Sequence, residues 1–286
     1  MQAVKPKTFA FSAIAATEVA VQQYRMSQLT SKTDVVAEEV PIALVYNGIS
    51  HAVMLATPQD LEDFAVGFSL TEGIVESAAD IYSTEIEAQE NGFAVQMEIA
   101  SASFSRLKDK RRNITGRTGC GLCGSESLDQ ALHLPTEMNA IAEKFKQNIL
   151  QLHAETLSAA FNNIRNQQKI LALTGATHAS ALVNALGEVV LLREDVGRHN
   201  ALDKLVGAMK KSANDFSAQH FVMTTSRASY EMVQKTVSAG VSMLVAISAP
   251  TALAVRIAEQ YGLTLVGFTR EHSFVIYCDP MNRVLT

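Results

Sequence analysis

Cysteine is scarce in this chain: only three are found among 286 residues. Three cysteines at uneven spacing cannot build a framework of disulfides, and at least one must stay unpaired, which favours a reducing compartment. Long apolar runs are also missing, because no stretch approaches the roughly 20 residues that span a bilayer. A short apolar run over residues 9–16 faintly resembles a secretory signal, but Ser12 interrupts it. We therefore expect a cytoplasmic protein without membrane association.

Tryptophan is absent and neither sign of charge dominates, since 24 basic and 29 acidic residues give a net charge of −5. Nucleic-acid binding would have to rest on one basic patch over residues 106–117, and we expect no nucleic-acid partner. With 48% hydrophobic and 19% charged residues, the chain is typical of an ordered globular protein. Its length predicts two compact units.

Several motifs with known chemistry are missing. No G-x-G-x-x-G or P-loop pattern accompanies the predicted strand ends of the last segment, so a nucleotide-bearing ligand would be bound there by another geometry. There is no G-x-S-x-G elbow, which disfavours a hydrolase built from Ser226, His178 and Asp195. His153 and Glu155 supply the H-x-E of a zinc deaminase, but they follow the cysteine pair instead of preceding it.

The chain does contain a cysteine pair set in glycine. Residues 118–124 read T-G-C-G-L-C-G, with Cys120 and Cys123 three apart. The glycines leave the sulfurs little shielded and free the backbone to expose its N–H groups. Basic residues outnumber acids just upstream, and positive charge favours the nucleophilic thiolate. These basic residues are Arg106, Lys108, Lys110, Arg111, Arg112 and Arg117. The pattern predicts a reactive sulfur.

Four interpretations of this pair are open. A structural zinc site needs four ligands, yet Cys278 is far downstream and only His178 or His199 could be recruited, so we expect no metal. A thioredoxin-like dithiol would follow the first strand of a βαβ unit, which the pair does not. A sulfur relay, in which one thiolate carries a persulfide, uses the displacement of disulfide exchange. Two inert thiols are disfavoured, because buried cysteines lie in apolar segments.

The hydrophobic pattern predicts an α/β (α+β) protein in four segments. Residues 1–35 show weak periodicity and are expected to form a loosely ordered leader. Residues 36–105 are expected to form a small N-terminal α+β domain. Residues 106–135 hold the basic segment and a flexible loop with the cysteine pair. Residues 136–286 alternate helices with strands, which predicts a mixed sheet flanked by helices.

Local signals place the elements within these segments. Hairpins are predicted at the Asn-Gly pairs of residues 47–48 and 91–92. Thr57 is predicted to cap the helix that begins with Pro58. Farther on, we expect a hairpin over residues 179–193, helices at 200–211, 230–239 and 253–261, and strands at 221–226, 243–248, 263–268 and 274–278.

Polar side chains gather where the strands of the last segment are expected to end. His178 precedes a predicted strand, Arg198 and His199 precede a predicted helix, and Arg227 follows another strand. The carboxyl ends of strands in open α/β sheets bind ligands, and arginine beside a helix N-terminus suits a phosphate. Asp195 is expected to serve as a cap and ion-pair partner. The set predicts an anion-binding cleft.

Five short segments resemble the FdhD family, sulfur carriers required to make active formate dehydrogenase. The likeness runs in order from about residue 36 to residue 277, nearly the whole chain. The segments are V-Y-N-G-I at 45–49, F-A-V-G-F at 64–68, T-G-C-G-L-C-G at 118–124, E-D-V-G-R-H at 194–199 and T-L-V-G-F at 264–268. Together they are far more specific than a lone C-x-x-C.

The resemblance implies a cytidine deaminase-like fold without the zinc site, and a homodimer. It also implies a sulfurtransferase, in which Cys120 receives persulfide sulfur from a cysteine desulfurase, with Cys123 as its partner. The sulfur then passes to the molybdenum cofactor, bis-molybdopterin guanine dinucleotide (Mo-bis-MGD), before that cofactor enters formate dehydrogenase.

The same resemblance maps the cofactor site to the segment after the last T-L-V-G-F motif. Its residues are Thr269, Arg270, Glu271, His272, Ser273 and Phe274. A cofactor with two pyrophosphates is strongly anionic, so we add Arg198, His199, Arg227 and His178 to the expected cofactor-binding residues. His178 or His199 could also serve as a general base. The alternative is a non-catalytic chaperone that binds Mo-bis-MGD for formate dehydrogenase and uses the C-x-x-C only as a redox latch.

Overall fold

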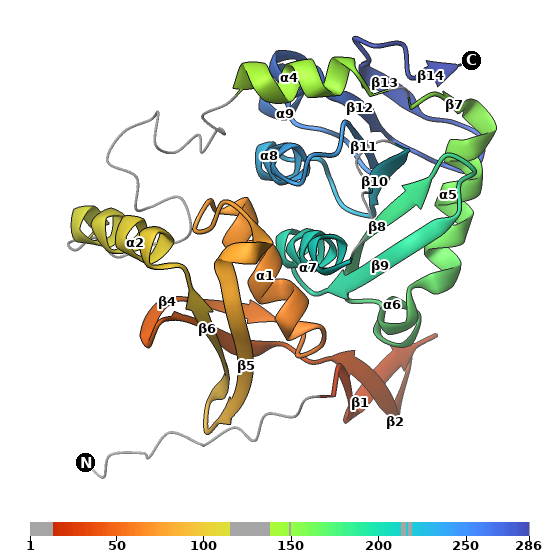
Figure 1. The fold of residues 1–286 in the computed structure, drawn as a ribbon. Helices are drawn as coiled ribbons and strands as arrows, with labels where there is room; N and C mark the ends of the chain where they lie inside the picture. Colours follow the sequence, from red (N-terminus) through yellow and green to blue (C-terminus); the bar gives the residue numbers. More distant parts are fainter. Residues whose placement is uncertain (1–13, 115–137, 149, 213–215, 217–218, 286) are drawn as a thin grey trace.

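Residues 14–114, 138–148, 150–212, 216 and 219–285 are described by a computed structural model (Figure 1). They form a six-stranded sheet, a four-stranded sheet and two sheets of two strands, with helices between them. The predicted mixed α/β class is therefore confirmed. Within these ranges, no helix is both long enough and apolar enough to cross a bilayer.

The first described residues form a long hairpin. β1 (Ala16–Arg25) pairs antiparallel with β2 (Gln28–Ala37) over its whole length. Met26 and Ser27 make the turn with φ of 49° and 61°, the left-handed conformation that a two-residue hairpin turn requires. The prediction of a loosely ordered leader over residues 1–35 is wrong for this part. Its side chains are mostly exposed on both faces, so the sequence lacks the apolar–polar alternation of a half-buried strand.

A four-stranded sheet follows, in the order β4-β3-β6-β5. Its strands are β3 (Val40–Tyr46), β4 (Ile49–Ala56), β5 (Ile81–Gln89) and β6 (Gly92–Ile99). Both predicted hairpins are confirmed, and parallel pairing of β3 with β6 joins them. The second turn lies at residues 90–91 instead of 91–92, because Gly92 is already paired with Gln89 as the first residue of β6. Helix α1 (Leu61–Thr71) packs Phe64 and Phe68 against this sheet. A single 3-10 turn, η1 (Ala78–Asp80), precedes β5.

The start of α1 differs from expectation. The helix begins at Leu61, after Asp60, so Thr57 is not its N-cap. Thr57 contacts the other half of the chain instead. Its N–H donates to Asp195 at 2.9 Å, and its hydroxyl accepts from the N–H of Val196 at 3.1 Å. A threonine that looks like a helix cap in the sequence therefore holds two distant segments together.

The basic segment after β6 also differs from expectation. It was predicted to leave the first domain as a loop at residue 106, but helix α2 (Ser101–Ile114) covers that position. Residues 101–114 contain neither glycine nor proline, and Phe104 and Leu107, three apart, pack on the core of the four-stranded sheet. Apolar contact on one side of the helix outweighs the charge on the other.

The carboxy-terminal half is built on a six-stranded sheet in the order β13-β12-β11-β10-β8-β9. Its strands are β8 (His178–Asn184), β9 (Val189–Asp195), β10 (His220–Thr224), β11 (Met243–Ala246), β12 (Thr264–Gly267) and β13 (Val275–Cys278). β9, β10, β11 and β12 run in one direction, and β8 and β13 run in the other. The predicted hairpin, the mixed sheet and its strands are confirmed.

Helices cover both faces of this sheet (Figure 1). They are α4 (Met138–Lys146), α5 (Ala154–Gln167), α7 (Arg198–Lys211), α8 (Tyr230–Ser238) and α9 (Ala252–Tyr261). The short helix α6 (Lys169–Thr174) lies against β1 and β2. Side chains alternate along each strand: Val222 packs toward α4, α7, α8 and α9, while Phe221 and Met223 pack toward α5. A short parallel pair, β7 (Leu152–His153) with β14 (Val284–Leu285), lies beside α5.

Two glycines bring the halves together where α1 crosses α7. A Cβ added to Gly67 would lie 1.7 Å from the carbonyl oxygen of Asp203, and one added to Gly207 would lie 1.9 Å from that of Asp63. The two helices lie side by side (Figure 1), and each glycine faces the backbone of the other helix. Such close approach is possible only without a side chain.

Candidate functional site

One edge of the six-stranded sheet collects the polar residues singled out in the sequence. β9, β10, β11 and β12 end at this edge, and the two opposed strands, β8 and β13, begin there. His178 is the first residue of β8 and lies opposite Asp195, the last residue of β9. Loops and helix starts along this edge therefore face a common space, which is where ligands bind in open α/β sheets.

Every expected cofactor-binding residue lies along this edge. Arg198 and His199 open α7 directly after β9, and Arg227 follows β10 as an exposed side chain. Residues 269–274 connect β12 to β13. The sequence placed these residues near strand ends, and the strand order now places them in one row.

His178 lies among charged neighbours. Burial lowers the pKa of His178, the positive charge of Arg198 lowers it further, and Asp195 opposes both. His199 adds to the lowering, so the two imidazoles and the guanidinium of Arg198 interact electrostatically. At neutral pH, His178 is therefore an uncharged imidazole that can accept or donate a hydrogen bond.

We expect the NMR titration of His178 to have its midpoint below the ordinary value of about 6.5. Because the pKa is depressed in the folded state, His178 contributes stability above that value, and this contribution is lost as the pH falls through the folded pKa. A His178→Gln variant assigns the resonance and should show a weaker dependence of stability on pH in this range. Arg198→Met should raise the midpoint without restoring it fully, because burial remains. A midpoint at or above 6.5 in the wild type would contradict this account.

Asp195 is fully buried and has a structural role. Its carboxylate accepts from Lys204 at 2.7 Å, from the N–H of Gly197 at 2.8 Å and from Asn200 at 3.1 Å. Lys204 also donates to the carbonyl of Thr57 at 2.9 Å, which ties α7 to the first half of the chain. The expectation that Asp195 forms an ion pair is confirmed, whereas the N-cap position of α7 is occupied by Gly197. With Asp195 so engaged, the hydrolase interpretation gains no support.

The loop between β12 and β13 is arranged around Arg270. The N–H of Arg270 donates to the carbonyl of Ser273 at 2.7 Å, closing a turn, and its guanidinium donates to the carbonyls of Ile247 and Thr269. Glu271, His272 and Ser273 are exposed and Phe274 is half-buried. This segment therefore presents its polar side chains to solvent at the sheet edge.

Two buried polar atoms on the edge lack hydrogen-bond partners among the described residues. They are the hydroxyl of Thr269 and the Nε of Arg198. Buried donors without partners are uncommon in proteins and are often completed by a ligand or water. Together with Arg227, they give the edge a donor-rich character that fits an anionic ligand.

Glu231 is a site residue that the sequence did not reveal. It lies in the first turn of α8, and His199 Nε2 approaches its carboxylate at 2.7 Å. An acidic residue in the first turn of a helix is common for dipole reasons alone, so its spacing carries no functional signal. The pairing exists only because α7 and α8 lie side by side.

The cysteines divide into two kinds. Cys120 and Cys123 lie outside the described residues, as do Arg117 and the rest of the glycine-rich loop. Cys278, at the end of β13, is a buried free thiol whose pKa is raised by burial to about 11. A thiol that stays protonated at neutral pH is a poor nucleophile, so Cys278 is structural.

Comparison with known proteins places this fold. The FdhD/NarQ family model matches residues 37–284. A sulfur carrier protein FdhD of Cupriavidus necator is 56% identical over 261 residues, which cover 91% of this chain and 88% of the relative. That of Bordetella petrii is 51% identical over 251 residues, or 87% of each chain. That of Xanthomonas euvesicatoria is 46% identical over 260 residues, or 91% of this chain and 89% of the relative.

A solved structure agrees with the fold. The crystal structure of a candidate formate dehydrogenase accessory protein from Desulfotalea psychrophila matches with a TM-score of 0.71 at 23% identity. The match covers 95% of this chain and 100% of that one. The molecule is thus a mixed α/β protein with a polar edge on its larger sheet. The chain belongs to the FdhD/NarQ family, and the resemblance inferred from its sequence is confirmed.

Proposed function

We propose that this protein is a sulfurtransferase that carries persulfide sulfur on Cys120 and delivers it to Mo-bis-MGD for formate dehydrogenase. The observation that carries the proposal is the row of His178, Arg198, His199, Arg227 and residues 269–274 on one sheet edge. This row gives an anionic sulfur acceptor a binding site in the same chain as a reactive thiol pair. The relatives named as sulfur carrier proteins support the assignment.

Loading is a displacement at sulfur. The Cys120 thiolate attacks the terminal sulfur of a persulfide on the cysteine desulfurase, the S–S bond of that persulfide breaks, and the desulfurase thiolate leaves. The carrier then holds Cys120–S–SH, with no net oxidation or reduction. The basic residues that precede the pair favour the thiolate that this step needs.

Release uses the second cysteine. The Cys123 thiolate attacks the Cys120 sulfur of the persulfide, a Cys120–Cys123 disulfide forms, and hydrosulfide leaves for the bound acceptor. The two electrons that convert the carried sulfur to sulfide come from the dithiol. A small-molecule or protein thiol then reduces the disulfide and resets the pair.

The sheet edge would hold the acceptor during this transfer. Arg198 and Arg227 can each make forked contacts to a phosphate or pyrophosphate, and the first turn of α7 adds backbone N–H donors. His178, uncharged at neutral pH, can hydrogen-bond to a heterocycle or take up a proton. We further propose a homodimer that meets the cysteine desulfurase and formate dehydrogenase in the cytoplasm.

Intact-protein mass spectrometry tests this proposal. After incubation with a cysteine desulfurase and cysteine, the wild type is expected to gain one sulfur atom that dithiothreitol removes. Cys278→Ala should gain it equally, because the pKa of Cys278 is raised to about 11 and its thiol stays protonated. In parallel, calorimetry should detect binding of GDP, which carries the guanine and diphosphate of the proposed ligand. A wild type that gains no sulfur would overturn the carrier role.

The second candidate is a chaperone that binds the cofactor without carrying sulfur. It is favoured by the same sheet edge, because none of the residues in the row belongs to the cysteine loop. GDP binding without any sulfur gain would support it. The Cys120 variant considered in the Discussion separates the two.

A further inference from the structure

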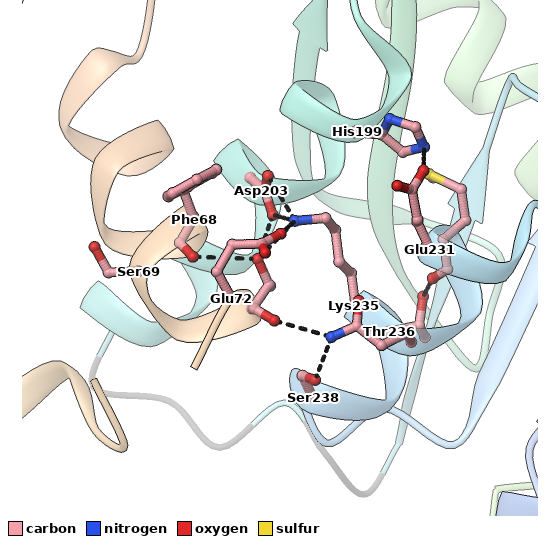
Figure 2. A network of polar contacts seen from close by, with 12 residues as sticks. Phe68, Ser69, Glu72, His199, Asp203, Glu231, Lys235, Thr236 and Ser238 are labelled. Atoms are coloured by element: carbon pink, nitrogen blue, oxygen red, sulfur yellow. Dashed lines mark hydrogen bonds and ion pairs between the residues drawn. The ribbon is translucent and has the colours of Figure 1, made fainter. Parts of the chain in front are cut away.

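Two polar rungs join α7 and α8. These helices both follow strands that run in the same direction, so they lie parallel. His199 pairs with Glu231 on the outer rung, and Asp203 pairs with Lys235 on the inner rung (Figure 2). His199 and Asp203 are four residues apart on α7, and Glu231 and Lys235 are four residues apart on α8, which is about one helical turn in each case. The two rungs are therefore in register.

The inner rung is buried, and its Lys235 has several hydrogen-bond partners. Lys235 Nζ lies 3.0 Å from both carboxylate oxygens of Asp203 and 2.8 Å from Glu72 (Figure 2). It also lies 2.9 Å from the Thr71 hydroxyl. Burial alone would lower the pKa of Lys235, but Asp203 and Glu72 outweigh it and hold the pKa above its ordinary value. The ammonium therefore stays charged and fixes α8 against α7 and the end of α1.

The outer rung is only half-buried and lies at the ligand edge. His199 Nε2 is 2.7 Å from Glu231 and 3.5 Å from the Ser229 hydroxyl, which sits at the start of α8. The hydrogen bond from His199 is the largest of the causes that lower the pKa of Glu231. Glu231 is thus an ionised acceptor, and an ionised carboxylate cannot donate. The bond to it must come from Nε2–H.

The other nitrogen of this ring has no such engagement. Nδ1 of His199 makes no hydrogen bond to any residue that the structure describes, and it points away from Glu231 (Figure 2). In a neutral imidazole, the nitrogen opposite the N–H carries a lone pair. A carboxylate that holds one ring nitrogen therefore decides what the other can do, as for histidines oriented by carboxylates in metal sites.

We propose that Glu231 is a positioning residue that locks His199 in the Nε2–H tautomer and leaves Nδ1 as a hydrogen-bond acceptor on the ligand edge. The class of ligand that follows rests on the proposed function. Guanine and the pterin of the cofactor carry N–H donors, which a free Nδ1 can accept. Arg198, beside it in the chain, supplies the charge for the phosphates. Glu231 itself touches no ligand and acts through His199.

Imidazole ¹⁵N NMR tests the lock directly and needs no ligand. In the wild type, the neutral imidazole of His199 should be the Nε2–H tautomer. A His199→Ala variant assigns the resonances of this ring. Glu231→Gln keeps an acceptor oxygen and should keep this tautomer, whereas Glu231→Ala should give a mixture. Glu155→Gln, which removes a charge from an exposed position on α5, should change nothing. An Nδ1–H tautomer in the wild type, or no change in Glu231→Ala, would overturn the proposal.

GDP affinity tests whether the lock serves the ligand. Glu231→Ala and His199→Ala should each weaken binding by roughly three- to tenfold, the size of one hydrogen bond. The double variant should bind no more weakly than His199→Ala alone, because Glu231 acts through that ring. Independent losses that multiply would show that Glu231 has a separate role and would overturn the inference. A wild type that binds no GDP would count against the proposed ligand, and the ¹⁵N result would still decide the positioning role.

Discussion

Cys120→Ala is expected to gain no sulfur from the desulfurase and to leave formate dehydrogenase inactive. The expected loss is complete, because neither remaining cysteine replaces Cys120. Cys123 serves only in release in the proposed mechanism, and Cys278 is buried with its pKa raised to about 11. Cys123→Ala is expected to behave differently. It should load sulfur on Cys120 and accumulate the persulfide, because release needs the second thiolate. Mass spectrometry of both variants, with formate dehydrogenase activity in cells that contain them, measures the two effects.

The matched control for these variants is Cys278→Ala, which should load and deliver sulfur like the wild type. Thermal unfolding of Cys120→Ala should match that of the wild type, so that lost activity is not lost fold. If Cys120→Ala still activates formate dehydrogenase and still binds GDP, the chaperone is the better description. If Cys123→Ala loads and also delivers normally, release by the second cysteine is wrong, although the carrier role stands.

Short-range signals in this sequence predicted well because their cause is local. An Asn-Gly pair favours a tight hairpin through its own backbone preference, and both predicted hairpins form here. In the second hairpin the turn lies at residues 90–91, and Gly92 is the first residue of β6. Strands and helices of the last segment followed from apolar periodicity and glycine stops. The polar residues at strand ends fell into one row because strand direction fixes which ends meet. These parts required no knowledge of distant contacts.

The errors arose where a distant contact decides. Thr57 has the local pattern of a helix cap, but Asp195 and Val196 engage it from far along the chain. The basic residues of α2 led to the prediction of a loop, but Leu107 packs into the core of the four-stranded sheet and the segment is helical. The sequence did not reveal Glu231 as a site residue, because its partner His199 lies on another helix. Whether the chain divides at residues 35, 105 and 135 stays a prediction.

Gly207→Ala is expected to destabilise the protein by about 3 kcal/mol, although alanine is the better helix former. In an unhindered helix the same change stabilises by roughly 0.5–1 kcal/mol. Here the new Cβ would lie 1.9 Å from the carbonyl oxygen of Asp63, and backbone cannot move aside as a flexible side chain can. α1 and α7 must separate instead. Thermal unfolding should show the midpoint falling by roughly 10 °C.

Three further variants test whether the helix crossing is the cause of this loss of stability. Gly67→Ala should cost a similar amount, since its Cβ would meet the carbonyl oxygen of Asp203 at 1.7 Å. The double variant should cost less than the sum, because one separation of the helices relieves both clashes. Gly73→Ala has open space and only a left-handed φ of 63°, so it should cost about 1 kcal/mol. Equal costs at Gly73 and Gly207 would mean that the helix crossing is not the cause.

The same crossing connects stability to the site. α7 begins with Arg198 and His199, and it continues through Asp203 to Gly207 against α1. A shift of α7 away from α1 would draw both rungs to α8 out of register and move the polar edge. Gly207→Ala that remains folded at low temperature should therefore bind GDP more weakly than the wild type, whereas Gly73→Ala should bind it normally. Unchanged affinity in Gly207→Ala would show that the sheet alone, and not the helix crossing, positions the ligand edge.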